Sequence, residues 1–451
     1  MQRSIPEGER LFSNRALASL IIPLVIEQFL AMLIGTTASM MVSSISEAAV
    51  SAISLVDSVN ILFIQLFSAM GAGGAIVAAQ YLGKHEALNA CNAAKQLLHG
   101  SLLISLMVAA VSCAFCEPLL RLCFGNLDPI TMQYSRTFFY LSALSYPAMA
   151  LYNGSAALMR AMGNGSAPMF ASLLMNVLNI ALSALMIYGL GMGVAGAGWA
   201  ALIGRIAGAL VITRLLINPG GRIHLIRPFH FELDKEMLKR IFRIGVPNGL
   251  ENSIFQVGKL LVAGIVATYG VSMIAANAIV NNIIMLFSIP GSAIGLSIIA
   301  VIGQSVGAGD ARQARYYTVK LIKLSYLILA PLNLILFFAA RPIAMLYPLS
   351  AEAIDVAADL LRWCAAFTIL FWTTSFLPPC ALRAAGDAKF TMFVSVLSMW
   401  ICRVALSYLL AYTFDLKLLG VWLAMFFDWI VRSACFLWRY KSGKWLQKRV
   451  V

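Results

Sequence analysis

Twelve long apolar segments are the feature that most limits what this chain can fold into. Each holds about 20 or more residues with few charges, and none alternates apolar and polar residues as a membrane β-strand does. A helix of that length crosses the roughly 30 Å hydrocarbon core of a bilayer. The sequence therefore predicts an all-α polytopic membrane protein with twelve transmembrane helices near residues 16–41, 51–78, 91–115, 132–158, 167–190, 194–214, 244–268, 273–303, 316–339, 351–380, 390–413 and 418–438.

The overall composition leads to the same class. Of the 451 residues, 61% are hydrophobic and 12% are charged, against roughly 45–50% and about 25% in soluble domains. This composition excludes a soluble enzyme, a nucleic-acid-binding domain and a disordered scaffold. Residues 1–15 are polar, and the apolar run that follows is too long for the core of a signal peptide, so we expect the first segment to remain as a span.

The basic residues predict the orientation of the helices. The net charge is +14, but the basic residues gather in short loops beside the apolar segments, which is typical of topology signals rather than of a nucleic-acid-binding surface. The loops on the side of the two termini carry twenty-one Lys and Arg residues, against three on the other side. The positive-inside rule therefore predicts a multi-pass protein of the plasma or inner membrane with both termini in the cytoplasm.

The longest loop, near residues 215–243, lies at the middle of the chain. Its apolar residues share one helical face, and Lys and Arg residues are interleaved on the other. The apolar face consists of Leu233, Met237, Leu238, Ile241 and Phe242. We interpret this stretch as an interfacial helix lying on anionic lipid headgroups, with a solvated linker helix as the alternative.

The two halves of the chain repeat one another at an offset of about 224 residues. Glu27 corresponds to Glu251, and RAMGNGSAPMF at 160–170 corresponds to RAAGDAKFTMF at 383–393. Six spans per half is an even number, so the halves share one orientation, as in parallel-repeat transporters. We expect two pseudo-symmetric bundles that face each other across a central cleft. The predicted domains are an N-terminal six-helix bundle (1–214), a cytoplasmic linker (215–243) and a C-terminal six-helix bundle (244–451).

Two of the repeated residues are carboxylic acids inside apolar segments. Glu27 lies about eleven residues into its span, near the middle of the membrane, and Glu251 holds the equivalent place. An acid at this depth must be paired, hydrated or protonated, so both are candidates for coupling to H⁺ or Na⁺; a purely structural acid is the alternative. Pro23 and Pro247 stand one turn earlier, where each frees a backbone carbonyl and bends its helix.

Further polar residues inside the spans are candidates for lining a substrate cavity. Such groups are expected to face protein or water rather than lipid, although they could also serve only to tie helices together. Asn277 and Asn281 lie one turn apart, whereas Lys259 lies too far beyond Glu251 for a direct ion pair. The candidate cavity residues are Gln28, Asp57, Asn60, Asn179, Asn252, Gln256, Asn277, Asn281 and Arg403.

Taken in order, four segments resemble the multidrug and toxin extrusion (MATE) family along essentially the whole chain. The segments are SEAAVSAISLVDSVN (46–60), IYGLGMGVAGAGWAALIGR (187–205), GVPNGLENSIFQVGKLLV (245–262) and ALRAAGDAKFTMF (381–393). The resemblance implies two six-helix bundles, a large internal cavity, and export of organic, often cationic, compounds driven by inward H⁺ or Na⁺. It also makes Glu251, which keeps the family's acid of the seventh span, the first candidate for ion coupling, with Glu27 second.

The chain departs from the family pattern at two positions. Many members carry an Asp in the first span where this chain has Ala38, and one branch carries an essential Asp in the fifth span where this chain has Ser183. We therefore do not expect the N-terminal ion site of that branch.

Together these observations predict a secondary active antiporter that exports amphipathic organic cations by rocking of its two bundles. The alternatives are an exporter of an endogenous metabolite on the same fold, or a flippase for lipid-linked precursors. A flippase usually has a strongly basic cavity, and few basic residues lie in these spans. We expect no enzyme, because only four His and no HExxH motif are present. We also expect a monomer with no cofactor, and no metal apart from a candidate Na⁺ at Glu251.

Overall fold

The computed structural model describes the chain except residues 1–4, 7–8, 126, 226–231, 348 and 449 and the side chains of residues 34–40. Its contacts divide the chain into two compact units. Residues 14–249 form the first, called the N-unit below. Residues 250–450, with the described residues before Asn14, form the second, called the C-unit. The division falls between Gly249 and Leu250, beyond the end of the predicted linker (215–243). It lies inside a long helix that starts at Lys235.

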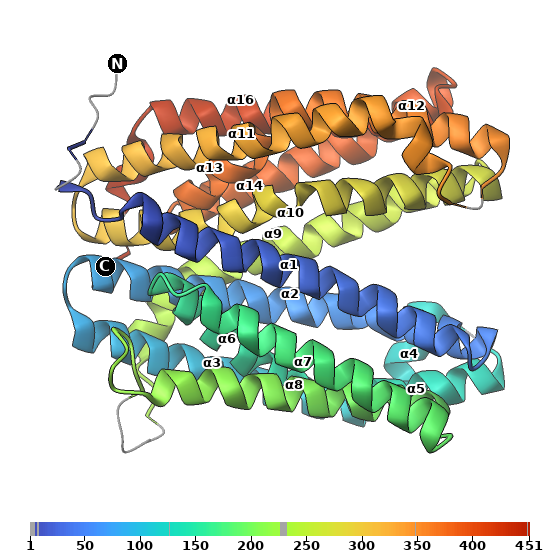
Figure 1. Ribbon diagram of the computed structural model, residues 1–451, viewed down its shortest axis with the longest axis horizontal. Helices are drawn as coiled ribbons and strands as arrows, with labels where there is room; N and C mark the ends of the chain where they lie inside the picture. Colours follow the sequence, from blue (N-terminus) through green and yellow to red (C-terminus); the bar gives the residue numbers. More distant parts are fainter. Residues whose placement is uncertain (1–4, 7–8, 126, 226–231, 348, 449) are drawn as a thin grey trace. The chain divides into compact units, whose positions relative to one another are not determined.

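The N-unit is built of helices, joined by short connections except between α8 and α9 (Figure 1). Side-chain caps begin two of them: Ser46 accepts a hydrogen bond from the backbone N–H of Ala49, and Asp128 accepts one from Thr131. The helices are α1 (Asn14–Ser43), α2 (Glu47–Gly83), α3 (Ala87–Ala114), α4 (Cys116–Phe124), α5 (Pro129–Leu144), α6 (Tyr146–Ala161), α7 (Ser166–Ala184), a π-helical turn (Leu185–Gly189), α8 (Gly193–Ile217) and the first part of α9 (Lys235–Ala267).

The C-unit repeats this order of helices. Asp310 and Ser350 cap two of them by accepting hydrogen bonds from backbone N–H groups of the first turn. The helices are the rest of α9, α10 (Val271–Gly307), α11 (Ala311–Ala344), α12 (Ala351–Phe367), α13 (Thr373–Ala384), α14 (Ala388–Ser398), α15 (Leu406–Tyr408) and α16 (Lys417–Lys441), with π-helical turns at Thr368–Trp372, Met399–Ala405 and Leu409–Thr413.

The described helices account for all twelve predicted spans. Ten helical segments are long and apolar enough to cross a membrane. The other two predicted spans are interrupted: Pro129–Ala161 breaks at Ser145, and Ala351–Ala384 contains the π-helical turn at Thr368–Trp372. At the first break Pro147 lacks the N–H that would continue the hydrogen-bond ladder of α5. The predicted fold class, an all-α membrane protein with twelve spans in two bundles, is confirmed.

The predicted interfacial helix is the first part of α9, and its apolar face packs against protein. Met237 and Ile241 are buried. A Cβ built on Gly73 of α2 would lie 2.7 Å from the carbonyl oxygen of Ile241, and one on Gly100 of α3 would lie 3.0 Å from a methyl group of Leu238. Because glycines in α2 and α3 let α9 approach this closely, helices cover part of the predicted apolar face, whereas Leu233, which precedes α9, is 41% exposed.

Candidate functional site

The predicted acid of the N-unit forms a buried ion pair. Arg160 Nη1 donates to both carboxylate oxygens of Glu27, at 3.0 and 3.4 Å. The two side chains are 15% and 8% exposed. Arg160 is the penultimate residue of α6. The carboxylate of Glu27 is therefore close to the end of that helix, since the arginine side chain alone reaches it. Within its own helix, α1 (Asn14–Ser43, 30 residues), Glu27 lies near the middle.

The C-unit contains the same arrangement. Arg383 Nη1 donates to Glu251 Oε2 at 3.3 Å, and the two side chains are 16% and 7% exposed. Arg383 also donates to Cys380 Sγ. It is the penultimate residue of α13, the position that Arg160 holds in α6.

Sequence reasoning missed the arginine half of both pairs. Arg160 and Arg383 open the two repeated segments, but as basic residues near loops they were counted as topology signals. The available signal was the repeat itself, because acid and arginine recur together at nearly the same offset. Each partner lies more than 130 residues along the chain from its acid, so helix periodicity alone could not have joined them.

A second polar cluster lies in the N-unit where α5 breaks from α6. The buried amide of Asn60 donates to Asp57 Oδ1 (3.1 Å) and to Ser142 Oγ (3.2 Å), and it accepts from the Tyr146 hydroxyl (2.8 Å). Arg205 donates to the hydroxyl of Ser145 at 2.7 Å. These bonds connect α2, α5, α6 and α8, so Asn60 is committed to protein partners, whereas Asp57 is exposed at the edge of the cluster.

The C-unit contains a cavity of about 240 Å³ lined by residues of α9, α10, α16 and the π-helical turn at Met399–Ala405, and two of its lining residues, Lys259 and Asn281, are exposed. Three of the predicted cavity residues line it: Asn277, Asn281 and Arg403. Lys259, which was not among the predicted cavity residues, lines it as well. Glu251 and Asn252 are not among the lining residues. The remaining wall is apolar and consists of Val262, Ala263, Val266, Val421, Trp422 and Met425.

Basic side chains gather around this cavity. Lys259 Nζ lies 5.3 Å from the centroid of the Phe255 ring, and the guanidinium carbons of Arg403 and Arg432 lie 5.6 and 5.7 Å from the same centroid. One carboxylate, that of fully buried Asp428, interacts electrostatically with Arg403. The spans carry few basic residues, but the tertiary structure brings two of them, Lys259 and Arg403, to the lining of one cavity.

The other predicted residues are not among those that form the two ion pairs or line the cavity. Gln28, Asn252 and Gln256 are partly exposed on the helices that carry the two acids. Asn179 packs beside Gly204 of α8, where an added Cβ would lie 3.6 Å from the Cβ of Asn179. Pro23 and Pro247 lie inside continuous helices.

Two further expectations concern ion sites. Ser183, at the position of a branch-specific Asp, is buried in α7, and the side chain of Ala38 lies outside the described residues. Over the part of the chain that is described, no three His, Cys, Asp or Glu side chains gather as metal ligands. Na⁺ at Glu251 stays a prediction.

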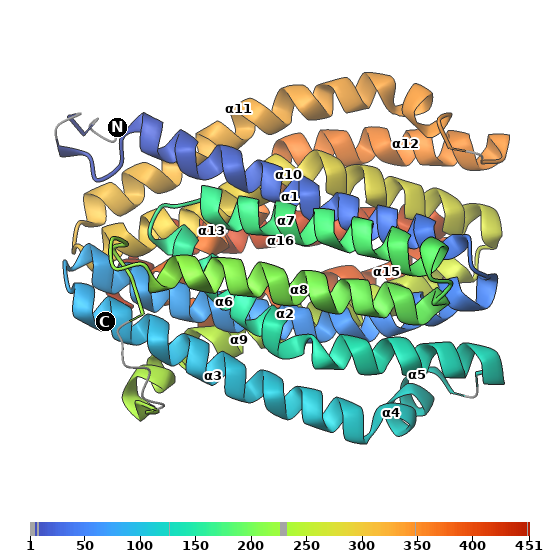
Figure 2. The same cartoon turned by 60° about the horizontal axis from the view of Figure 1, so that its bottom comes forward.

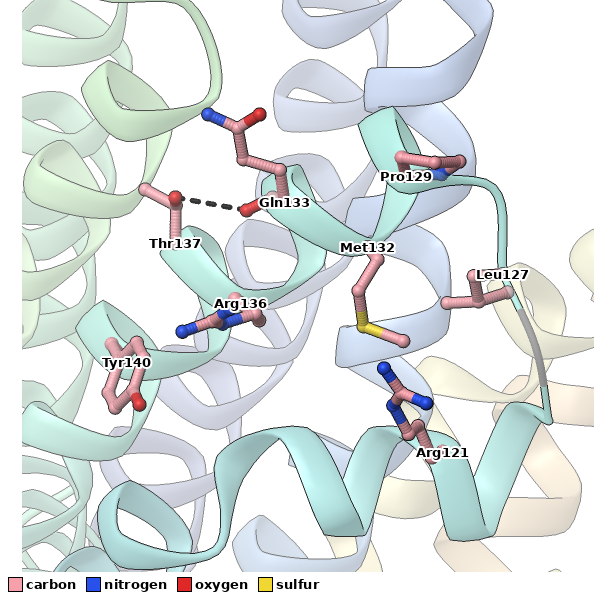
Figure 3. A pocket seen from close by; sticks show the side chains of 8 residues that line it. All are labelled: Arg121, Leu127, Pro129, Met132, Gln133, Arg136, Thr137 and Tyr140. Carbon is pink, nitrogen blue, oxygen red and sulfur yellow. Dashed lines mark hydrogen bonds between the residues drawn. The ribbon is translucent and has the colours of Figure 1, made fainter.

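A separate pocket on the N-unit is lined by residues of α4, α5 and the segment that joins them. Figure 2 shows these two helices beside the end of α3. Arg121 and Arg136 line the pocket together with Met132, Gln133 and Tyr140 (Figure 3). Both arginines pair with Glu117, at 2.7 and 3.1 Å, and about half of each arginine side chain is exposed. Exposed pairs of this kind contribute little to stability, and the pocket shares no residue with the buried ion pairs.

The sequence model of the MatE family matches residues 23–185 and 247–409. The two matched stretches begin at Pro23 and Pro247 and are separated by the offset of the internal repeat. Together they cover more than half of the chain. The chain belongs to the MatE family. The predicted family and the internal repeat are thereby confirmed, and the protein is a multi-pass membrane protein of this family.

Relatives of this MatE-family protein match over nearly its whole length. The uncharacterized transporter YisQ of Bacillus subtilis is 27% identical, over 96% of this chain and 95% of YisQ. The probable multidrug resistance protein NorM of Thermotoga maritima is 25% identical, over 99% of this chain and 96% of NorM.

Solved structures share the fold of this MatE-family protein. A crystal structure of MATE in the bent conformation aligns with a TM-score of 0.88 at 21% identity, over 96% of both chains. The outward-facing conformation of a multidrug resistance MATE family transporter aligns with a TM-score of 0.89, again at 21% identity over 96% of both chains. The predicted fold is thus one that has been solved in related proteins.

Proposed function

We propose that this protein is a secondary active exporter that moves amphipathic organic compounds out of the cell in exchange for inward H⁺ or Na⁺. The observation that carries the proposal is the buried Glu–Arg pair that recurs in both halves, Glu27 with Arg160 and Glu251 with Arg383. Membership of the MatE family and the transporter names of its relatives support export rather than catalysis.

Each pair holds a carboxylate that can exchange one cation for another. The guanidinium of Arg383 neutralises Glu251. A proton or Na⁺ that binds this carboxylate takes the place of the arginine and leaves the guanidinium without its anion. Because an unpaired buried charge is costly, ion binding favours a different arrangement of the surrounding helices. Pro247, one turn before Glu251, supplies a point at which α9 can bend.

The proposal extends to the placement of the protein in the cell. We place it in the cell membrane with cytoplasmic termini, because twenty-one basic residues flank the spans on that side against three on the other. We also propose that it acts as a monomer. The substrate is not restricted to cations. Both acids that would attract a cation are already paired with arginine, and the C-unit cavity carries basic groups.

Transport in proteoliposomes tests the proposal. The full-length protein is reconstituted with ethidium or with the anionic dye fluorescein, and either a proton gradient or a sodium gradient is imposed alone. We expect one gradient to drive dye movement and Glu251→Gln to slow it at least tenfold, with a smaller loss for Glu27→Gln. Asp359→Asn, which alters an exposed acid of α12, is the matched control and should transport as the wild type does.

Two results would count against this function. Dye movement that proceeds equally with and without a gradient would exclude coupled export. If neither gradient moves any dye while fluorescent lipid-linked precursors cross the bilayer, a flippase replaces the exporter.

A further inference from the structure

We propose that the C-unit cavity, lined by Lys259, Arg403, Asn277 and Asn281, binds the anionic group of a small amphipathic compound. The groups recognised are a carboxylate, a sulfonate or a phosphate. This inference goes beyond the proposed function, which leaves the charge of the substrate open.

The polar wall of the cavity is rich in hydrogen-bond donors. Lys259 and Arg403 carry donors only. The amide nitrogen of Asn281 already donates to the backbone carbonyl of Asn277 at 2.8 Å, which fixes the orientation of one of the two lining amides. A cation would meet two like charges here, whereas an anion would meet two opposite ones.

The positive charges converge on one point. Lys259 Nζ and the Arg403 guanidinium both lie within 6 Å of the Phe255 centroid, so their separation cannot exceed the sum of these two distances. Both side chains also line the same cavity, so an anion bound there would lie near both charges. Arg432 adds a third cation at the same ring, and Asp428 offsets one of the three charges.

Buried donors at the cavity lack acceptors. Among the described residues, Trp422 Nε1 and Arg403 Nε have no hydrogen-bond partner, and neither does Arg432 Nε behind them. Trp422 lines the cavity and is 3% exposed. Buried donors normally find acceptors, and an anion in the cavity would supply oxygens to those of Trp422 and Arg403.

The size and the apolar wall limit the rest of the ligand. A volume of about 240 Å³ is below the ~300–1,000 Å³ of drug-sized pockets. The rest of the lining consists of valine, alanine, methionine and tryptophan side chains. The fit is therefore one anionic group on an apolar body of about one aromatic ring.

Calorimetric titration of the full-length protein in nanodiscs of neutral phosphatidylcholine tests the site directly. The probes are benzoate and benzylamine, which share a ring but carry opposite charges. We expect benzoate to bind at least tenfold more tightly than benzylamine. Equal affinities, or tighter binding of benzylamine, would overturn the proposal whatever happens to any variant.

Matched variants locate the binding. Lys259→Gln and Arg403→Asn, the latter installing the residue found at the repeat position Asn179, should each weaken benzoate binding at least tenfold. Lys259→Arg keeps the charge and should retain binding. Lys323→Gln removes an exposed lysine of α11 and should have no effect. Benzoate affinity that is unchanged in folded Lys259→Gln and Arg403→Asn proteins contradicts the site.

A second set of nanodiscs, which contain anionic lipid, distinguishes a lipid headgroup from a free anion as the occupant of the cavity. If anionic headgroups occupy the cavity, nanodiscs containing phosphatidylglycerol should weaken benzoate binding in the wild type. If the occupant is a free anion, the lipid should make no difference; both outcomes retain the anion site. Because no gradient is applied, binding can fail while coupled export holds, and export can fail while binding holds.

Discussion

The N-unit and the C-unit keep the same buried ion pair but differ in the polar groups elsewhere in their interiors. In the N-unit, Asn60 connects Asp57 to the hydroxyl groups of Ser142 and Tyr146. In the C-unit, Lys259 and Arg403 face a cavity. Asn179 and Arg403 hold equivalent positions in the repeat, so one substitution accounts for part of the difference in charge. The Glu–Arg pair therefore belongs to the framework that both halves share, and the charge of the interior is where they diverged.

The largest expected effect comes from removing one arginine of a buried pair. Arg160→Met and Arg383→Met should each lower the free energy of unfolding by about 3–5 kcal/mol, because each leaves a buried carboxylate without its cation. The two losses should be similar, since the two pairs are almost equally exposed. Equilibrium unfolding in detergent–lipid micelles measures them.

Two controls sharpen this comparison. Arg121→Met removes the arginine of an exposed pair and should cost about 0–1 kcal/mol. The double variant Glu27→Gln/Arg160→Met removes both charges and should recover most of the loss. A cost near that of Arg121→Met at only one of the two buried pairs would show that the halves do not share this framework.

A smaller effect is expected at two glycines, because a neighbouring helix approaches Gly73 of the N-unit more closely than another approaches Gly295 of the C-unit. A Cβ on Gly73 would lie 2.7–3.0 Å from backbone atoms of Ile241 and Gly245 in α9, so Gly73→Ala should destabilise the protein by about 1–3 kcal/mol. In α10 a Cβ on Gly295 would meet only side-chain atoms, at 3.4 and 3.5 Å. Gly295→Ala should therefore be neutral or slightly stabilising. Equal melting temperatures for the two variants would contradict the close approach of α9.

The smallest effect is expected at Asp234, whose carboxylate accepts a hydrogen bond from the backbone N–H of Met237 in the first turn of α9. The backbone N–H of Met237, with help from the Asn92 amide, holds the pKa of Asp234 below its ordinary value of 3.8. A lowered pKa means that the charge stabilises the fold at neutral pH and that this contribution is lost as the pH falls below about 4. Asp234→Asn should cost less than about 1 kcal/mol, and thermal melts should show the difference constant from pH 7 to 5 and shrinking as the pH falls below 3.8.

Much of the architecture follows from the sequence because it depends on local properties. Apolar length sets the number of spans, and an even number of spans per half makes the repeat parallel. The structure supports these predictions with ten single spans and two interrupted ones. The two acids and their prolines were also found from sequence, since a charge inside an apolar run is visible without neighbours.

Only the tertiary structure decided which groups those charges meet. Arg160 and Arg383 reach their acids from more than 130 residues away. Lys259, Arg403 and Arg432 come from different helices and meet at one ring. The sequence predicts that the face of Met237 and Ile241 lies on lipid headgroups, but both side chains are buried and α9 approaches α2 closely at Gly73. Periodicity tells which side chains share a face, but the neighbour of that face depends on how helices pack, and that neighbour determines whether a charge is paired, buried or free to bind.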